Sequence, residues 1–248
     1  MQNLTLILAS SFNSSIKDSQ GNRHPTWLPD NNLYLSNIKK HTPKLDHVLC
    51  IANDPLDHEI TDERCNILFK SLKQSGLVFK KQTILDSRNQ NLATDLISTA
   101  DLIFLCGGKL ECQLDFFNQI NLKTLLNNRI TPTLIVGGSA GAMNLCTQSF
   151  NFPESSADLT SATTLLNGLG FYHGLIVPHF DGERKIYDYE SDIDITSYIL
   201  KQSHYTPLLA FNDDSYILIH KGIPTYHGVF YQIKDGKITR LKTHFPSV

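Results

Sequence analysis

The alternation of short apolar runs with segments of helical periodicity is the feature that most restricts the fold of this chain of 248 residues. Alternating strands and helices are typical of βαβ units, whose parallel strands form one sheet with helices on both faces. The sequence therefore predicts an α/β fold of three layers around a mainly parallel sheet. Strand character is found at residues 4–8, 47–52, 78–85, 101–106, 133–136 and 174–177, and helical character at 56–75, 91–99 and 111–127.

The C-terminal part of the chain has a different pattern. Apolar runs at residues 208–211 and 216–219 precede two short runs that flank the turn Asp235-Gly236, a dipeptide typical of tight β-hairpins. This pattern predicts a small antiparallel addition. No linker interrupts the chain, so residues 1–248 are expected to form a single domain. The polar segment 10–30 is expected to be a long loop, and loops of this length are usually functional or mobile.

Charge and composition exclude several classes of partner. The chain has 22 Lys and Arg residues against 24 Asp and Glu residues, a net charge of −2, which provides no general attraction for nucleic acid or anionic lipid. The apolar stretch near the N-terminus is too short for a signal sequence or a membrane span. The five cysteines include no C-x-x-C pair, and reduced thiols are expected. These features predict a cytoplasmic protein with no nucleic-acid or membrane partner.

One sequence motif is typical of a catalytic site. Residues 137–141 read Gly-Gly-Ser-Ala-Gly and fit the pattern G-x-S-x-G, in which a serine occupies a sharp turn between a strand and a helix. The preceding strand and the following helix-forming residues agree with this interpretation. Ser139 is therefore a candidate nucleophile. Two alternatives remain open at this point, a phosphate-binding loop at a helix N-terminus and a glycine turn that only permits close packing.

A serine hydroxyl needs a base to remove its proton. Val177 and Pro178 enforce extended backbone before His179, which places this histidine at the carboxyl end of a strand, where Ser139 also lies. His173 is the rival base, but it precedes the same strand. The position at the end of the strand therefore favours His179 as the base.

The base in turn needs an acid, and in α/β hydrolases the acid lies between the serine and the histidine in the chain. Glu154 and Asp158 lie in that interval, and Glu154 is favoured because Pro153 stiffens the chain before it, whereas Asp158 is also suited to cap a helix. Two further alternatives are another acid such as Asp181 and a site of two residues without an acid. The oxyanion formed during acyl transfer needs backbone N–H donors, for which Ala140 and the Gly107-Gly108 pair are candidates.

Together these segments resemble the peptidase E and cyanophycinase family of serine peptidases. The resemblance spans most of the chain and is carried by residues 100–108, 137–142, 168–170 and 176–180. It implies a fold similar to class I glutamine amidotransferases, with serine in place of their elbow cysteine. It also implies hydrolysis of small peptides next to aspartate, with no metal or cofactor.

Transferred residue by residue, the resemblance implies that Ser139 is the nucleophile, that His179 is the base, and that Gly108 and Ala140 are the oxyanion donors. Glu154, fifteen residues after the serine, falls where the family has its Asp or Glu.

The chain also departs from the family pattern. Lys109 stands where asparagine is usual, and the turn at residues 212–215 reads Asn-Asp-Asp-Ser in place of the usual Asp-Glu-Gly turn. Lys109 and Arg184 are the candidate substrate-binding residues.

The main expectation is thus a serine peptidase of peptidase E type, a dipeptidase or small-peptide hydrolase that acts through an acyl-enzyme. Two alternatives are a cyanophycinase-like hydrolase of β-aspartyl peptides and a non-catalytic member of the same fold that binds a small ligand or a partner. A homodimer is one of the oligomeric states that the sequence leaves open.

Overall fold

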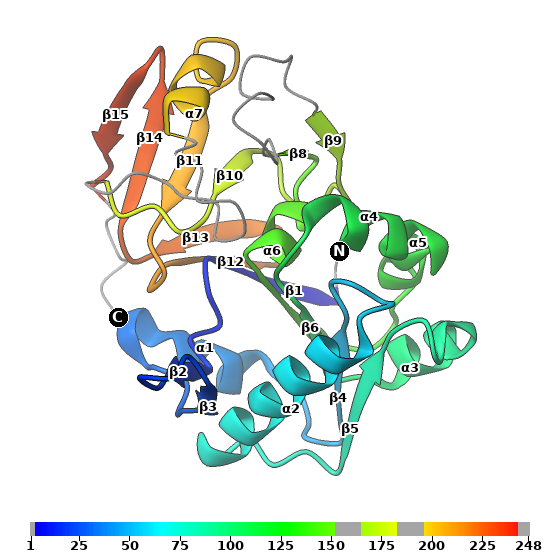
Figure 1. Ribbon diagram of the computed structural model, residues 1–248. Helices are drawn as coiled ribbons and strands as arrows, with labels where there is room; N and C mark the ends of the chain where they lie inside the picture. The colour runs from blue at the N-terminus through cyan, green and yellow to red at the C-terminus, as the bar shows by residue number, and fades with distance from the viewer. Residues whose placement is uncertain (1–2, 152–164, 183–195, 243–248) are drawn as a thin grey trace.

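The computed structural model describes residues 3–151, 165–182 and 196–242, and a seven-stranded sheet lies at its centre (Figure 1). The strand order is β13-β12-β1-β7-β6-β4-β5. From β1 to β5 in this order all neighbours are parallel, whereas β12 and β13 extend the sheet in antiparallel pairing. Although the strand expected at residues 174–177 belongs to a second sheet, the predicted mainly parallel sheet is confirmed. Its strands are β1 (Leu4–Ala9), β4 (His47–Ile51), β5 (Lys81–Leu85), β6 (Leu102–Leu105), β7 (Thr133–Gly138), β12 (Tyr216–His220) and β13 (Ile223–His227).

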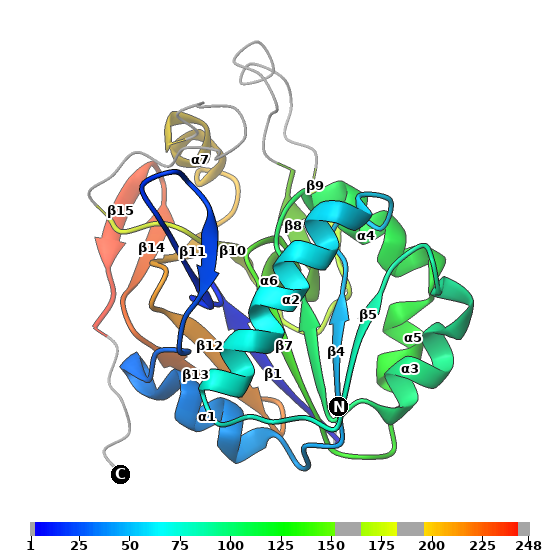
Figure 2. The ribbon, with the colours of Figure 1, turned by 60° about the horizontal axis from the view of Figure 1, so that its bottom comes forward.

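Helices cover both faces of this sheet. In β6, Leu102 and Phe104 pack with side chains of α1 and α2, whereas Ile103 and Leu105 pack with those of α3 to α6. This burial on both sides explains why the strands read as continuous apolar runs. In Figure 2, α1 and α2 lie on the face turned towards the viewer. The helices are α1 (Tyr34–His41), α2 (His58–Gln74), α3 (Ala93–Thr99), α4 (Leu110–Gln119), α5 (Leu122–Asn127) and α6 (Ala140–Leu145), with short 3-10 turns at Asn31–Leu33 and Gln90–Leu92.

Local signals explain where several helices begin and end. The Asp57 side chain accepts a hydrogen bond from the N–H of Ile60 at 3.1 Å, which caps the N-terminus of α2. The helix expected over 111–127 is two helices, because Asn121 adopts a left-handed φ of 57° between α4 and α5. Helix α6 ends at Leu145, because Cys146 is already extended at ψ 166°.

A second, four-stranded sheet has the order β10-β11-β14-β15. The expected antiparallel addition is thus divided, since β12 and β13 extend the central sheet while the other C-terminal strands join β10. Tyr198 and Ile199 of α7 (Thr196–Gln202) belong to the apolar core on this second sheet. Its strands are β10 (Leu175–Val177), β11 (Leu208–Phe211), β14 (Phe230–Lys234) and β15 (Lys237–Arg240).

The segment 10–30, expected to be a loop, contains a small hairpin of β2 (Ser15–Lys17) and β3 (Arg23–Pro25). It is fastened to α2, because the Ser71 hydroxyl donates to the carbonyl oxygen of Thr26 at 2.5 Å and the N–H of Leu28 donates to Ser75 Oγ at 2.8 Å. A second hairpin pairs β8 (Gln148–Phe150) with β9 (Leu165–Asn167). Within the described ranges, no helix is both long and apolar enough to cross a bilayer.

The two sheets meet where several strands end. The N–H of Ser10, directly after β1, donates to the carbonyl oxygen of Ser215 at 3.2 Å, and the N–H of Phe180 donates to the carbonyl oxygen of Phe211 at 3.0 Å. The chain segments that follow β1, β10 and β11 are therefore joined to one another. Strand β7 is parallel to β1, so the residue that follows it arrives at the same place. Loops gathered at the carboxyl ends of parallel strands are the usual location of sites in α/β folds.

Candidate active site

Ser139 occupies the sharp turn between β7 and α6. Its backbone has φ 51° and ψ −117°, a conformation that a non-glycine residue adopts only when its surroundings enforce it. Its N–H donates to the carbonyl oxygen of Ala9 at 3.0 Å, and its carbonyl oxygen accepts from Met143 at 3.0 Å. A Cβ at Gly137 would lie 2.6 Å from the carbonyl oxygen of Gly141, so the turn can close only around glycine. This geometry is the one expected of a nucleophile elbow.

His179 lies two residues beyond β10 and also has a left-handed backbone, with φ 61°. Its Nε2 atom is 2.9 Å from Ser139 Oγ. Its backbone N–H donates to Ser10 Oγ at 2.7 Å, which fixes the residue to the end of β1. His173, the rival base, lies before β10 and contacts Thr147 at 3.1 Å. The structure thus brings His179 to Ser139.

Asp213 approaches the other side of the imidazole. Its Oδ1 atom lies 2.5 Å from His179 Nδ1 and also accepts a hydrogen bond from Ser10 Oγ at 3.0 Å. Burial raises the pKa of the Asp213 carboxyl, but the hydrogen bond and charge of His179, together with the Ser10 bond, outweigh burial and hold the pKa below its usual value. Asp213 is therefore suited to remain ionised beside the imidazole.

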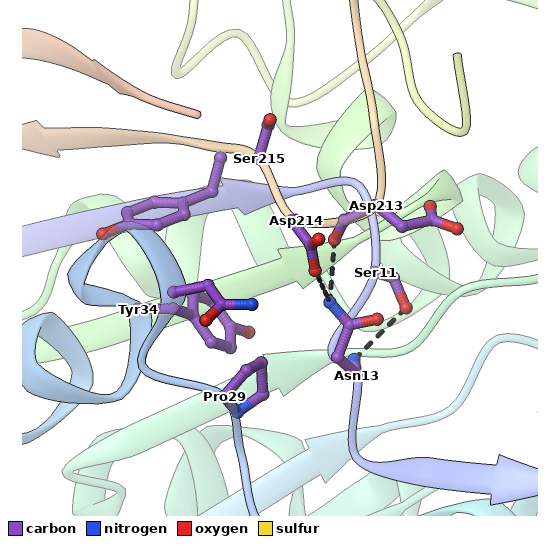
Figure 3. A pocket seen from close by; sticks show the side chains of 9 residues that line it. Ser11, Asn13, Pro29, Tyr34, Asp213, Asp214 and Ser215 are labelled. Atoms are coloured by element: carbon purple, nitrogen blue, oxygen red, sulfur yellow. Dashed lines mark hydrogen bonds between the residues drawn. The ribbon is translucent and has the colours of Figure 1, made fainter. Parts of the chain in front are cut away.

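The loop that carries Asp213 is held by the segment after β1. The Asn13 side-chain amide donates to the carbonyl oxygen of Asp213 at 2.8 Å and to Asp214 Oδ1 at 3.4 Å, and Asn32 donates to the carbonyl oxygen of Asp214 at 2.8 Å. Figure 3 shows Asn13 below these residues, with the Asp213 carboxylate pointing away from it. The segment 10–30 thus has a structural connection to the site.

The glycine pair after β6 lies against the elbow. A Cβ at Gly107 would be 3.0 Å from Ser139 Cβ, and Gly108 has φ 144°, a conformation that favours glycine. Ala140 is the first residue of α6, and the first N–H groups of a helix have no partner within it. Both expected oxyanion donors therefore belong to segments that adjoin Ser139.

The remaining expected residues are distributed differently. Lys109 is exposed and directly follows Gly108. Glu154, Asp158 and Arg184 lie outside the described residues. Asp181, the third alternative for the acid, accepts a hydrogen bond from Tyr231 on its carbonyl oxygen at 2.6 Å.

Among the described residues, Asp213 holds the position at Nδ1 that the sequence interpretation assigned to Glu154. Asp213 was missed because the acid was sought between the serine and the histidine in chain order. The usable signal was that Asp213 follows an apolar strand, as His179 does. Ser10 was missed because a single hydroxyl in a loop has no distinctive pattern. In the described part of the chain, no group of three or more His, Cys, Asp or Glu side chains could hold a metal ion.

Known proteins resemble this chain in sequence and in fold. Residues 61–224 match the model of peptidase family S51. The fold resembles the crystal structure of a peptidase from an acI-B1 Actinobacterium, with a TM-score of 0.67, 17% identity, and coverage of 96% of this chain and 94% of that one. It also resembles a putative peptidase E from Listeria monocytogenes EGD-e, with a TM-score of 0.58, 18% identity, and coverage of 92% and 98%. Among curated proteins, no sequence matches the chain.

Proposed function

Because the chain belongs to peptidase family S51 and is a serine peptidase, we propose that Ser139, His179 and Asp213 are its catalytic triad and that it hydrolyses small peptides. The observation that supports this most strongly is the continuous chain of hydrogen bonds from Ser139 Oγ through both nitrogens of His179 to Asp213. The proposed substrates are dipeptides with aspartate at the first position. This choice follows the resemblance to peptidase E.

The first half of the reaction forms an acyl-enzyme. Asp213 at Nδ1 holds the imidazole tautomer whose Nε2 accepts the Ser139 proton as Oγ attacks the peptide carbonyl carbon. The imidazolium that forms is stabilised by the Asp213 carboxylate. The carbonyl oxygen becomes an oxyanion, which the N–H groups of Ala140 and Gly108 would stabilise. When the C–N bond breaks, Nε2 returns its proton to the leaving amine.

The second half repeats these roles with water. His179 removes a proton from water, the hydroxide attacks the acyl carbon, and Ser139 leaves as the hydroxyl after receiving the proton from Nε2. Proton transfer at every step passes through His179 Nε2. The short distance between Ser139 and His179 places the pair within reach of this transfer.

Two cations are proposed to recognise the aspartate of the substrate. Lys109 is exposed and directly follows Gly108, one of the proposed oxyanion donors. Arg184 follows His179 by five positions in the sequence. A carboxylate ligand between two such cations would gain a charge-assisted contact.

A panel of dipeptides tests the proposed function. The panel contains Asp, Glu, Arg or Leu at the first position, together with β-aspartyl-arginine, and release of the free amino group is measured. We expect the Asp-first substrate to be hydrolysed fastest, Ser139→Ala to be inactive, and the control Ser11→Ala to be active. Preference for β-aspartyl-arginine would instead assign the cyanophycinase-like class. If the folded wild type neither hydrolyses any of these peptides nor forms an acyl-enzyme with them, the alternative of a non-catalytic binding protein is supported.

A further inference from the structure

The loop formed by Gly107, Gly108 and Lys109 needs an external support. All three residues are exposed, and a glycine pair loses more conformational entropy on ordering than any other dipeptide. An oxyanion hole, however, functions only if its donors are already oriented when charge develops on the substrate. The side chains that hold this loop are therefore of direct interest for the proposed reaction.

Asn53 holds the outer side of the loop. It follows β4, the neighbour of β6 in the central sheet. Its Oδ1 accepts a hydrogen bond from the N–H of Lys109 at 2.8 Å, and its Nδ2 donates to the carbonyl oxygen of the same residue at 3.0 Å. The side-chain amide therefore pairs with both backbone groups of Lys109, as a neighbouring strand would.

Asn53 also explains why residue 108 is glycine. A Cβ at Gly108 would overlap Asn53 Oδ1 and Cγ, so the amide lies directly against the α-carbon of Gly108. The same side chain thus contacts Gly108 and fixes the residue after it.

Two buried amides hold the inner side. Gln113 of α4 donates to the carbonyl oxygen of Cys106 at 2.5 Å. Asn144 of α6 donates to Gln113 Oε1 at 3.1 Å and to the carbonyl oxygen of Leu110 at 3.0 Å. Both side chains are fully buried, and α6 is the helix that begins at Ala140. The loop is thus fastened on both sides of Gly107 and Gly108, and the inner side is tied to the helix of the nucleophile elbow.

We propose that Asn53 is a positioning residue that aligns the Gly108 N–H with that of Ala140 and so completes the oxyanion hole. The inference rests on the proposed function and adds to it a residue that acts through the loop. Asn53 has no described hydrogen bond to Ser139, His179 or Asp213, so its loss should leave the triad intact. Stabilisation of the tetrahedral intermediate should weaken while binding of the ground-state substrate is maintained.

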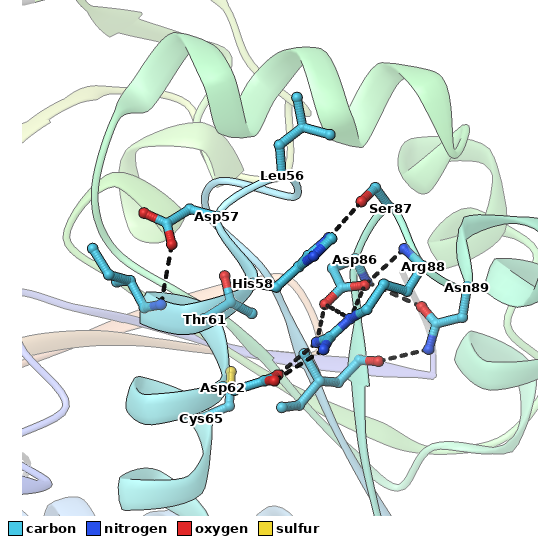
Figure 4. Close-up of polar contacts among 12 residues, drawn as sticks. Leu56, Asp57, His58, Thr61, Asp62, Cys65, Asp86, Ser87, Arg88 and Asn89 are labelled. Carbon is cyan, nitrogen blue, oxygen red and sulfur yellow. Dashed lines mark hydrogen bonds and ion pairs between the residues drawn. The ribbon is translucent and has the colours of Figure 1, made fainter.

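The test compares Asn53→Ala and Asn53→Asp with a matched control. Asn89 after β5 also uses both ends of its side-chain amide, although on two different residues: its Oδ1 accepts from the N–H of Asp86 at 3.1 Å and its Nδ2 donates to the carbonyl oxygen of Ile84 at 2.8 Å (Figure 4). In the strand order, β4 and β6 separate β5 from the strand of the elbow. Asn89→Ala therefore removes two comparable side-chain-to-backbone hydrogen bonds away from the proposed site.

The expected result for Asn53→Ala is a fall in kcat of about 100-fold with KM changed by less than about threefold, as for loss of one oxyanion donor. Affinity for a peptide aldehyde, which forms a tetrahedral adduct with the serine, should fall by the same factor as kcat/KM. Asn53→Asp keeps the acceptor for Lys109 but loses the donor, so its kcat should be intermediate. Asn89→Ala should have the wild-type kcat, and thermal melts should show that every variant is folded.

Two outcomes separate the possible failures. Suppose first that the wild type hydrolyses the dipeptide, but Asn53→Ala either has the kcat of Asn89→Ala or loses kcat without losing aldehyde affinity. Asn53 then does not position the oxyanion loop, and this inference is overturned while the proposed function stands. If the folded wild type neither hydrolyses peptides nor binds the aldehyde, the proposed function is overturned, and the inference with it.

Discussion

Asp213 Oδ1 lies 2.5 Å from His179 Nδ1, although the two residues are 34 positions apart and follow neighbouring parallel strands of the second sheet. The order along the chain is therefore serine, histidine, acid. The elbow serine belongs to the central sheet and its two partners to the smaller one. The proposed site thus lies at the junction of the two sheets.

Replacement of Asp213 by asparagine should nearly abolish turnover. The amide would donate to Nδ1 and stabilise the tautomer with a proton on Nε2, which cannot accept the Ser139 proton, so kcat should fall by about 10⁴-fold as in other triads. Steady-state kinetics on the preferred dipeptide measure this, with Asp214→Asn as the neighbouring control. An inactive Glu154→Gln, Asp158→Asn or Asp181→Asn beside a nearly normal Asp213→Asn would place the orienting acid elsewhere.

Removal of the Ser10 hydroxyl should weaken the positioning of His179 and Asp213, the two proposed partners of Ser139. Ser10 Oγ is fully buried, donates to Asp213 and accepts from the N–H of His179. For Ser10→Ala we expect the free energy of unfolding to fall by about 1–2 kcal/mol through two lost hydrogen bonds. We expect kcat to fall by about 10-fold through misplaced groups.

Urea titrations and steady-state kinetics provide the two measurements for Ser10→Ala. Ser11→Ala is the control, because Ser11 Oγ accepts only from the N–H of Asn13 among the described contacts. Equal kcat in the two variants would show that Ser10 does not position the site.

Loss of the positive charge at Lys109 should weaken the preference for substrates with aspartate at the first position. If Lys109 binds the aspartate of the substrate, Lys109→Gln should raise KM for the Asp-first dipeptide about fivefold, the size of one exposed charge contact, and leave the Leu-first dipeptide unaffected. Arg184→Gln tests the second expected cation in the same way, and Lys73→Gln on α2 is the control. An equal change for both substrates would mean that these residues do not recognise the acidic group.

A buried histidine remote from the site should make stability depend on pH. Burial, together with the charge of Lys81, lowers the pKa of His47 from 6.5 to about 4. Between these two values the unfolded chain binds a proton at this residue that the folded protein does not bind. The free energy of unfolding should therefore fall as the pH decreases from about 6.5 towards about 4.

Urea unfolding of His47→Gln and of the exposed-site control His173→Gln across this pH range measures the effect. The His47 variant should show a weaker dependence than the wild type, and the control should show the same dependence as the wild type. An unchanged pH dependence in His47→Gln would exclude this histidine as its source.

The sequence predicted the central sheet well because its strands are buried on both faces and so appear as uninterrupted apolar runs. The strand-end positions of Ser139 and His179 were predicted for the same reason. The helix over 111–127 was divided by a left-handed Asn121, which no periodicity reveals. The split of the C-terminal strands between two sheets was also not predictable, since periodicity does not specify pairing partners.

The acid and its supports were harder to predict. Chain order depends on fold topology, so the order known from α/β hydrolases did not point to Asp213. Asn53 and Ser10 lie in loops, where a single amide or hydroxyl has no pattern that separates a loop clamp from a solvated side chain. The geometry was needed to find them.

Covalent labelling of Ser139 tests the central claim most directly. The wild type, His179→Ala and Asp213→Asn are incubated with a fluorophosphonate, and the modified residue is identified by mass spectrometry of proteolytic peptides. The account predicts rapid, stoichiometric modification of Ser139 in the wild type and strongly slowed modification in both variants. Folded wild type that remains unmodified, or that carries the label on another residue, would contradict it.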